Sequence, residues 1–192
     1  MFPQVTWSIP NTGKTIFLTF DDGPVPDVSP FVLQTLDAFD AKATFFCVGS
    51  NVEKNPKLFQ DVVRAGHAVG NHTHSHVNGW KTHADDYVKD VERCAKVVKS
   101  TLFRPPYGRI TPTQVRRLKT EYSICMWSVL SYDFDANVHQ DRCLKNLIRA
   151  TDSGDIVVFH DSIKAFPKMK YMLPRMLDHF SEKGYVFKSL MA

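Results

Sequence analysis

Strand-like and helix-like patterns alternate along almost the whole chain, and this alternation constrains the fold more than any other feature. Short apolar runs predict strands at 15–20, 43–48, 68–71, 123–128, 155–160 and 185–187. Amphipathic stretches predict helices at 29–39, 56–65, 84–100, 113–120, 140–151 and 168–183. Such alternation is typical of a parallel sheet covered by helices, so the sequence predicts an α/β fold.

The size and composition of the chain favour one domain. Its 192 residues, 43% of them hydrophobic, suffice for a substantial core. No repeat, low-complexity tract or long linker divides the sequence, so we expect a single catalytic domain over residues 1–192. A standard eightfold barrel needs about 250 residues, for which the chain is short. No apolar run is long enough for a transmembrane segment, and a net charge of +4 with scattered cations does not indicate nucleic-acid binding.

Two adjacent carboxylates, Asp21 and Asp22, end the first predicted strand just before the break at Gly23 and Pro24. Two like charges at the edge of a sheet raise a pKa or require a cation. The pair therefore favours a site where one carboxylate binds a metal and its neighbour handles a proton. A solvated Asp-Asp-Gly turn is the alternative interpretation of this stretch alone.

Three histidines fall within five residues at 72–76, directly after the predicted strand 68–71. His72 and His76 are four residues apart, so one turn brings both rings to the same side, and His74 is expected to point elsewhere. Histidine is the commonest neutral metal ligand, although solvated histidine clusters and expression tags also occur. Two histidines and one aspartate would form an open site for Zn²⁺ or a similar ion, which favours catalysis over a structural role.

The four cysteines are widely spaced and show no paired metal-binding pattern; they are Cys47, Cys94, Cys125 and Cys143. We expect free, buried thiols, which suit a reducing compartment. The segment 1–7 also lacks the features of a secretory signal, which indicates either a cytoplasmic location or a trimmed sequence, so the location stays unknown.

Four segments, in order, carry a resemblance to a known family: 19–24 (TFDDGP), 72–76 (HTHSH), 104–108 (RPPYG) and 158–161 (VFHD). They resemble the successive motifs of the polysaccharide deacetylases, carbohydrate esterase family 4, and the likeness extends over about residues 14–190. It implies an irregular, roughly seven-stranded (β/α) barrel. It also implies a hydrolase that removes acetyl groups from N-acetylated amino-sugar glycans such as chitin or peptidoglycan. The family's substrates mostly lie outside the cell, in contrast to a cytoplasmic location.

The resemblance implies a metal site and a proton acceptor. Asp22, His72 and His76 would hold a divalent metal, most simply Zn²⁺, with Co²⁺ and Ni²⁺ as alternatives for the same ligands. Asp21, left without the metal, would be the general base that takes a proton from water.

The resemblance also implies the other catalytic and substrate-binding roles. His160 would protonate the departing sugar amine, and Arg104 would orient the Asp21 carboxylate. A backbone N–H at Tyr107 would stabilise the oxyanion, in a loop stiffened by proline. The residues expected to contact the acetylated glycan are Pro105, Tyr107, Phe134, Val158 and Phe159.

One motif departs from the family pattern. Leu130 stands where relatives commonly have an aspartate, and Phe134 replaces a tryptophan that forms one wall of the sugar groove. Because the missing carboxylate would support the catalytic histidine, its loss is expected to lower the pKa of His160, unless Asp133 or Asp161 replaces it.

Two alternatives to an amide deacetylase therefore stay open. The first is a catalytically silent relative that binds carbohydrate or metal. The second is an esterase that removes O-acetyl groups from a glycan. Trp80, which follows the histidine cluster, is expected to pack rather than to line the groove, and no protein partner is predicted.

Overall fold

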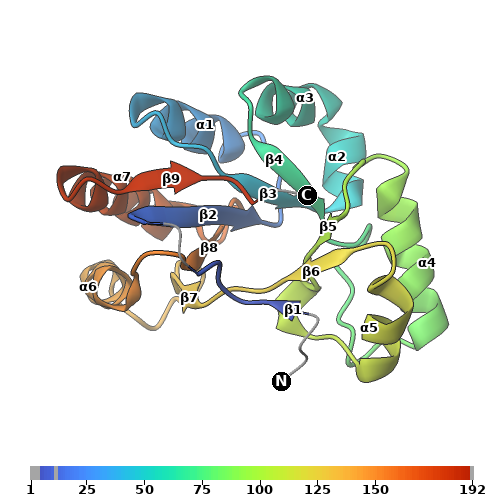
Figure 1. Ribbon diagram of the computed structural model, residues 1–192. Helices are drawn as coiled ribbons and strands as arrows, with labels where there is room; N and C mark the ends of the chain where they lie inside the picture. Colours follow the sequence, from blue (N-terminus) through green and yellow to red (C-terminus); the bar gives the residue numbers. More distant parts are fainter. Residues whose placement is uncertain (1–4, 11–12, 191–192) are drawn as a thin grey trace.

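The computed structural model describes residues 5–10 and 13–190, and it confirms the α/β barrel-like fold (Figure 1). The strands form one curled sheet in the order β1-β6-β5-β4-β3-β2-β8-β7, with β9 added to β2, and every named strand pairing is parallel. Among the described residues no pairing joins β1 to β7, so the barrel stays open. The helices lie around the outside of this sheet.

The strands are β1 (Val5–Thr6), β2 (Thr15–Asp21), β3 (Thr44–Cys47), β4 (Ala68–Asn71), β5 (Leu102–Phe103), β6 (Ser123–Cys125), β7 (Val129–Leu130), β8 (Ile156–His160) and β9 (Val186–Lys188). The helices are α1 (Ser29–Ala38), α2 (Gly49–Lys54), α3 (Pro56–Arg64), α4 (Ala84–Ala95), the short 3₁₀ helix η1 (Pro106–Gly108), α5 (Pro112–Leu118), α6 (Gln140–Ala150) and α7 (Phe166–Glu182).

Each of the predicted strands and helices is present, with ends shifted by a few residues. The largest shift is at α4, which ends at Ala95 instead of residue 100 because the carbonyl of Cys94 accepts from both Val97 and Val98, tightening the last turn. Three strands escaped prediction, β1, β5 and β7, because two residues are too few to show a periodicity. Helix α2 and η1 were also missed.

Strand β2 is buried along its whole length and lies between β3 and β8 in the sheet. Its residues Ile16, Leu18 and Phe20 pack into the main core, together with apolar residues of α1, α6 and α7. Because side chains alternate along a strand, Thr19 and Asp21 point to the opposite side, where both accept a hydrogen bond from Arg104. The hydrophobic face thus fixes the strand, and the other face carries polar groups into the barrel.

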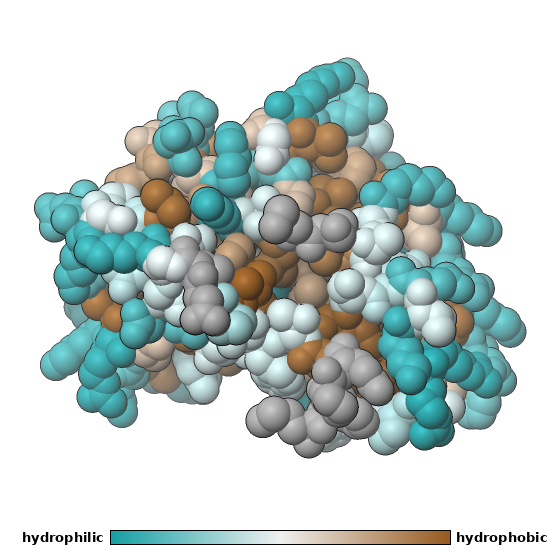
Figure 2. Space-filling view, viewed as in Figure 1, coloured by the Kyte–Doolittle hydropathy of each residue, from teal (hydrophilic) through white to brown (hydrophobic). Residues whose placement is uncertain are grey.

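The outer surface and the cysteines agree with the sequence analysis. In Figure 2 hydrophilic side chains dominate the periphery, over the helices, and hydrophobic residues show mainly toward the middle. All four cysteines are buried and free, as predicted. No helix in the described part of the chain has the length and apolar character needed to cross a membrane.

Candidate active site and metal centre

The motif residues meet at one cavity, at the end of the sheet where β2, β4 and β8 finish. Parallel strands bring their carboxyl ends to the same edge, so residues far apart in sequence become neighbours there. Asp21 lies beside His160 in the register of β2 and β8. The cavity has a volume of about 360 Å³ and is lined by Asp21, Asp22, His72, His76, Tyr107, Arg109, Trp127, Leu130, Phe134, His160, Ser162 and Lys164.

Asp22, His72 and His76 form a cluster whose potential ligand atoms all lie within 4.8 Å of one another. The Nε2 atom of His76 lies 3.1 Å from Oδ1 of Asp22, and Nε2 of His72 lies 3.8 Å from the same oxygen. The Nδ1 atom of His72 is 2.8 Å from the carbonyl oxygen of Arg104, to which it donates when Nε2 is the free ligand atom. This donor set fits a divalent cation such as Zn²⁺.

The protonation states of the cluster also suit a cation. Burial would raise the pKa of Asp22, but its hydrogen bond with His76 and the nearby charges of His72 and His160 lower that pKa to about 2. Burial lowers the pKa of His72 to about 4. At neutral pH the cluster therefore presents a carboxylate and a neutral imidazole, the forms in which these groups bind metals.

The third histidine lies outside this cluster. The backbone N–H of His74 donates to Asp90, and its Nε2 lies 3.7 Å from a carboxylate oxygen of Glu53. His74 is buried, with only 2% of its surface exposed. It therefore points away from Asp22, as the spacing predicted.

The backbone at the site is unusual at three of the lining residues. Asp22, His76 and Tyr107 have φ values of 89°, 54° and 61°, in the left-handed region that non-glycine residues rarely adopt. The Tyr107 hydroxyl lies 3.1 Å from Nδ1 of His76, so η1 contacts the Asp22–His72–His76 cluster. Strain of this kind persists only where surrounding contacts over-determine the geometry, and it is concentrated at functional sites.

Asp21 is held by a buried arginine. Its Oδ1 accepts from Nη1 of Arg104 at 2.7 Å, and 3% of Asp21 and 0% of Arg104 are exposed. The same guanidinium donates to the Thr19 hydroxyl and to the carbonyls of Cys125 and Met126. Four acceptors thus fix the guanidinium, which in turn fixes the carboxylate.

Asp133 is the carboxylate that supports His160. Its Oδ1 lies 2.8 Å from Nδ1 of His160, and its Oδ2 accepts from the His160 backbone N–H at 2.8 Å. Burial would lower the pKa of His160, but the hydrogen bond and charge of Asp133, with further charge from Asp21 and Asp22, raise it to about 9. The lower pKa of His160 expected from Leu130 in place of an aspartate is therefore not found, because Asp133 supplies the carboxylate. Leu130 itself lines the cavity.

Asp161 does not share that role. Its carboxylate accepts from the backbone N–H of Gly23 at 2.8 Å and from the Ser29 hydroxyl at 2.7 Å. Burial raises the pKa of Asp161 to about 8. A β-carbon on Gly23 would lie 1.9 Å from an oxygen of this carboxylate, so glycine is required where the chain after Asp22 passes Asp161.

The predicted substrate-binding residues are only partly brought together. Tyr107 and Phe134 line the cavity, and the ring of Phe134 meets the imidazole of His160 edge-on at 5.0 Å. Pro105 is buried directly before η1. Phe159 lies elsewhere: it alternates with His160 along β8, so it stacks on Phe20 in the main core at 5.9 Å.

Val158 is on the same face of β8 as His160 but is fully buried and does not line the cavity. Several lining residues went unnoticed in the sequence, among them Arg109, Trp127, Ser162 and Lys164. Arg109 directly follows the 104–108 segment, and Ser162 and Lys164 closely follow 158–161, so their places beside these segments could have drawn attention to them.

Trp80 corrects a further expectation. It is 63% exposed, so it does not pack into the core. Its ring lies under the guanidinium of Arg109, whose Cζ is 3.8 Å from the ring centroid. Because Arg109 lines the cavity, Trp80 lies beside the cavity rather than far from it.

The chain is similar to known proteins over most of its length. Residues 8–122 match the family model for polysaccharide deacetylases. The chain is 34% identical to a peptidoglycan-N-acetylglucosamine deacetylase of Bacillus cereus, over 95% of this chain and 89% of that protein. It is 34% identical to the deacetylase PgdA of Listeria monocytogenes over 93% of this chain, but over only 38% of that longer protein.

A chitooligosaccharide deacetylase of Bradyrhizobium is 31% identical over 77% of this chain and 71% of that protein. Among solved structures, the Bc1960 peptidoglycan N-acetylglucosamine deacetylase superposes with a TM-score of 0.92 at 28% identity, covering 97% of this chain and 91% of the other. A mutant of BA3943, described as a pseudoenzyme with restored activity, has a TM-score of 0.84 at 25% identity, covering 99% of this chain and 71% of the other.

Proposed function

This chain belongs to the polysaccharide deacetylase family, and we propose that it is a metal-dependent hydrolase that removes the acetyl group from N-acetylglucosamine units of a glycan. One observation supports this most: a buried carboxylate, Asp21, lies between a three-ligand cluster and the paired histidine His160 at a single cavity. The names of the curated relatives, which act on peptidoglycan or chitooligosaccharides, support an N-acetylglucosamine substrate.

Asp22, His72 and His76 would hold the metal. A divalent cation at such a site supplies a Lewis acid, which polarises an acyl oxygen and lowers the pKa of water. Three protein ligands leave room for substrate, as in other catalytic zinc sites.

The protein's own groups would carry the protons. Asp21 takes a proton from the water whose oxygen attacks the acetyl carbon, and Arg104 keeps the accepting carboxylate in place. As the carbon–nitrogen bond breaks, His160 gives its proton to the sugar nitrogen, so the products are acetate and a free amine. Asp133 holds His160 in the protonated form that this step needs. The backbone N–H of Tyr107 would donate to the oxyanion.

Removal of the metal tests the proposal. Acetate release would be measured from N-acetylglucosamine oligomers, peptidoglycan fragments and an acetyl ester, after chelation and after addition of Zn²⁺ or Co²⁺. We expect chelation to abolish release and added metal to restore it. His72→Ala should weaken metal affinity by at least about 100-fold, since even indirect partners of metal ligands contribute 10-fold to 100-fold.

The matched control is His83→Ala, which removes an exposed histidine outside the cavity and should bind metal normally. Acetate release that persists without metal would contradict the proposal. Release from the ester alone would identify an O-acetyl esterase, and metal binding without any release would identify a silent relative.

Replacing Asp133 should change the pH profile. With Asp133 present, His160 stays protonated up to pH about 9, so the alkaline limb of kcat is expected near that pH. In Asp133→Asn the hydrogen bond and the charge of Asp133 that raise this pKa are lost while burial still lowers it, so the pKa of His160 falls. The alkaline limb then moves to lower pH, and at pH 8 the rate falls relative to the parent protein, by up to about tenfold for each unit of the shift.

The stability that the Asp133–His160 pair contributes also depends on pH, in the direction that the raised pKa of His160 dictates. It is fully present below pH 6.5 and is lost as the pH rises through about 9. NMR titration of the His160 imidazole would measure the pKa directly, beside the kinetic profile. Asp178→Asn, which removes an exposed carboxylate from α7, serves as the control. A limb that stays near pH 9 in Asp133→Asn would exclude this role of Asp133.

A further inference from the structure

The segment 22–25, directly after β2, holds Asp22 in a strained conformation. Asp22 has a φ value of 89°, in the left-handed region, and its carboxylate is the one that faces His72 and His76. A residue other than glycine keeps this conformation only where surrounding contacts impose it. The direction of the Asp22 carboxylate therefore depends on the contacts that hold the backbone of 22–25.

Asp161, which directly follows β8, holds the N–H groups of this segment. Its Oδ1 accepts from the backbone N–H of Gly23 at 2.8 Å, and its Oδ2 accepts from the Ser29 hydroxyl at 2.7 Å. The Ser29 hydroxyl oxygen in turn accepts from the backbone N–H of Val25 at 2.8 Å. The proline between Gly23 and Val25 has no N–H. Asp161 thus engages both N–H groups that follow Asp22 in the segment, one directly and one through Ser29.

The carbonyl groups of the segment are held by α2 and the residue before it. The Asn51 side chain donates to the carbonyl of Asp22 at 2.8 Å, and the backbone N–H of Val48 donates to the carbonyl of Gly23 at 3.0 Å. Both groups are donors, so neither can accept from the N–H of Gly23. In the part of the chain that the structure describes, that N–H donates to Asp161 alone.

The Asp161 side chain touches this backbone and not the cavity. It is 1% exposed and is not among the described residues that line the cavity. A β-carbon on Gly23 would lie 1.9 Å from an Asp161 oxygen, so no water fits between the two residues. Burying a carboxyl group costs free energy unless its hydrogen bonds are made, and an apolar side chain would serve if packing alone were needed. The hydrogen bonds to the segment 22–25 therefore account for an aspartate at this position.

We propose that Asp161 is a positioning residue for Asp22: with Ser29 it holds the segment 22–25 so that the Asp22 carboxylate faces His72 and His76, and it thereby sets the affinity of the site for its metal. The inference rests on the proposed metal-dependent function and adds a residue outside the ligand set. Without the Asp161 carboxyl group the buried N–H of Gly23 loses its acceptor, and Asp22 relaxes toward an ordinary negative φ. The carboxylate then turns away from the two imidazoles.

The affinity of the metal-free protein for Zn²⁺, measured by competition with a chromophoric chelator, tests this. We expect Asp161→Ala to raise the Kd about 10-fold to 100-fold, the usual effect of removing an outer partner of a metal ligand. Asp161→Asn keeps an oxygen for the N–H of Gly23, so its Kd should lie closer to that of the parent protein. Ser29→Ala removes the acceptor for Val25 alone and should raise the Kd less than Asp161→Ala.

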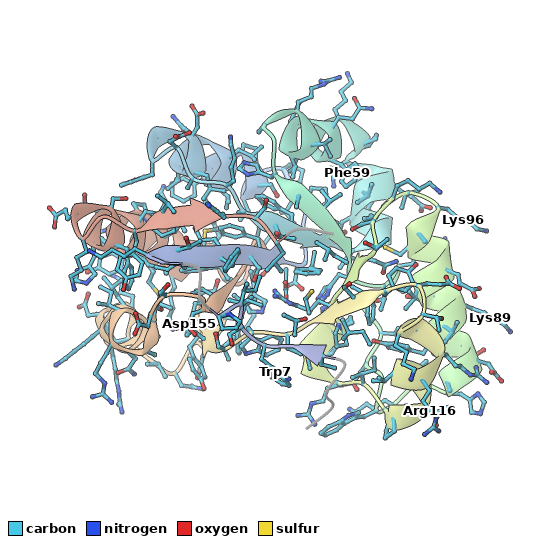
Figure 3. The ribbon with its side chains drawn as sticks, in the orientation of Figure 1. Trp7, Phe59, Lys89, Lys96, Arg116 and Asp155 are labelled. Atoms are coloured by element: carbon cyan, nitrogen blue, oxygen red, sulfur yellow. The ribbon has the colours of Figure 1, made fainter. Side chains whose placement is uncertain are left out.

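The matched control is Asp155→Ala, at a residue labelled in Figure 3. Asp155 directly precedes β8, whereas Asp161 directly follows it. The Asp155 carboxylate also accepts from a backbone N–H, that of Asp152 at 2.6 Å, and from a serine hydroxyl, that of Ser128 at 2.7 Å. Asp155→Ala therefore removes the same kinds of bond at the opposite end of the strand and should leave the Kd for Zn²⁺ unchanged. Thermal unfolding of the metal-free variants would measure the stability that each has lost.

Two results would overturn the inference. One is an unchanged Kd in folded Asp161→Ala, and the other is an equal rise in Kd in Asp155→Ala, which would indicate general destabilisation. If Asp161→Ala does not fold, Ser29→Ala decides, and an unchanged Kd in that variant would count against the inference in the same way. Failure of the proposed function is distinct: the parent protein would then bind no metal, or would release acetate without it.

Discussion

Replacing Asp21 by asparagine is expected to reduce kcat by about 10²-fold to 10⁴-fold, the usual contribution of a general base. Asparagine has the same shape and keeps one oxygen for Arg104, but it cannot take a proton from water. The Arg104 guanidinium would also keep its bonds to Thr19, Cys125 and Met126, so the fold should persist. Acetate release at saturating metal measures the effect.

Two measurements test whether the loss of activity has a simpler cause. Metal affinity would reveal a lost metal, and thermal unfolding would reveal a destabilised fold. Asp21→Asn should bind metal nearly as well as the parent protein, because Asp22, His72 and His76 are intact. Asp22→Asn should instead lose metal affinity along with activity. Asp61→Asn, which changes an exposed carboxylate on α3, should affect neither. Substantial activity in metal-loaded Asp21→Asn would exclude Asp21 as the base.

The Asp22–His72–His76 cluster and Asp21 could be singled out from the sequence because each follows a strand with a clear pattern. The run ending at Asp21 is apolar and long enough to identify, and the spacing of His72 and His76 restricts where their rings can point. The parallel α/β arrangement followed from the alternation of strands and helices, and the irregular barrel followed from the family resemblance. These features depend on local pattern, which the sequence carries directly.

The parts of the site that the sequence did not predict depend on contacts between distant segments. Asp133 reaches His160 through a turn after β7, a strand too short to be predicted, so the sequence left two candidates for the role. Phe159 was assigned to the pocket from its motif, although alternation along β8 turns it into the core. Arg109 and Lys164 resemble any solvated cation until the cavity that they share is known.

Activity and stability both depend on the Arg104 side chain. Its guanidinium is fully buried, so Arg104→Met would leave the Asp21 carboxylate unpaired and three other acceptors without their donor. Removing one partner of a buried ion pair typically costs about 3–5 kcal/mol. We expect the free energy of unfolding, measured with denaturant at neutral pH, to fall by that amount.

A double-mutant cycle with Asp21→Asn then separates the charge pair from the other bonds of Arg104. If the unpaired carboxylate dominates, Asp21→Asn combined with Arg104→Met should be more stable than Arg104→Met alone, since the uncompensated charge is gone. Arg104→Lys keeps the charge without the planar fork, so its free energy of unfolding should lie between those of the parent protein and Arg104→Met. A loss below about 1 kcal/mol in Arg104→Met, within the range of exposed ion pairs, would contradict a buried pair. Asp21→Asn also leaves a buried charge, that of Arg104, without its partner, so it should lose some stability as well as activity. Arg104→Met should lose activity along with stability, as expected if Arg104 acts by positioning Asp21.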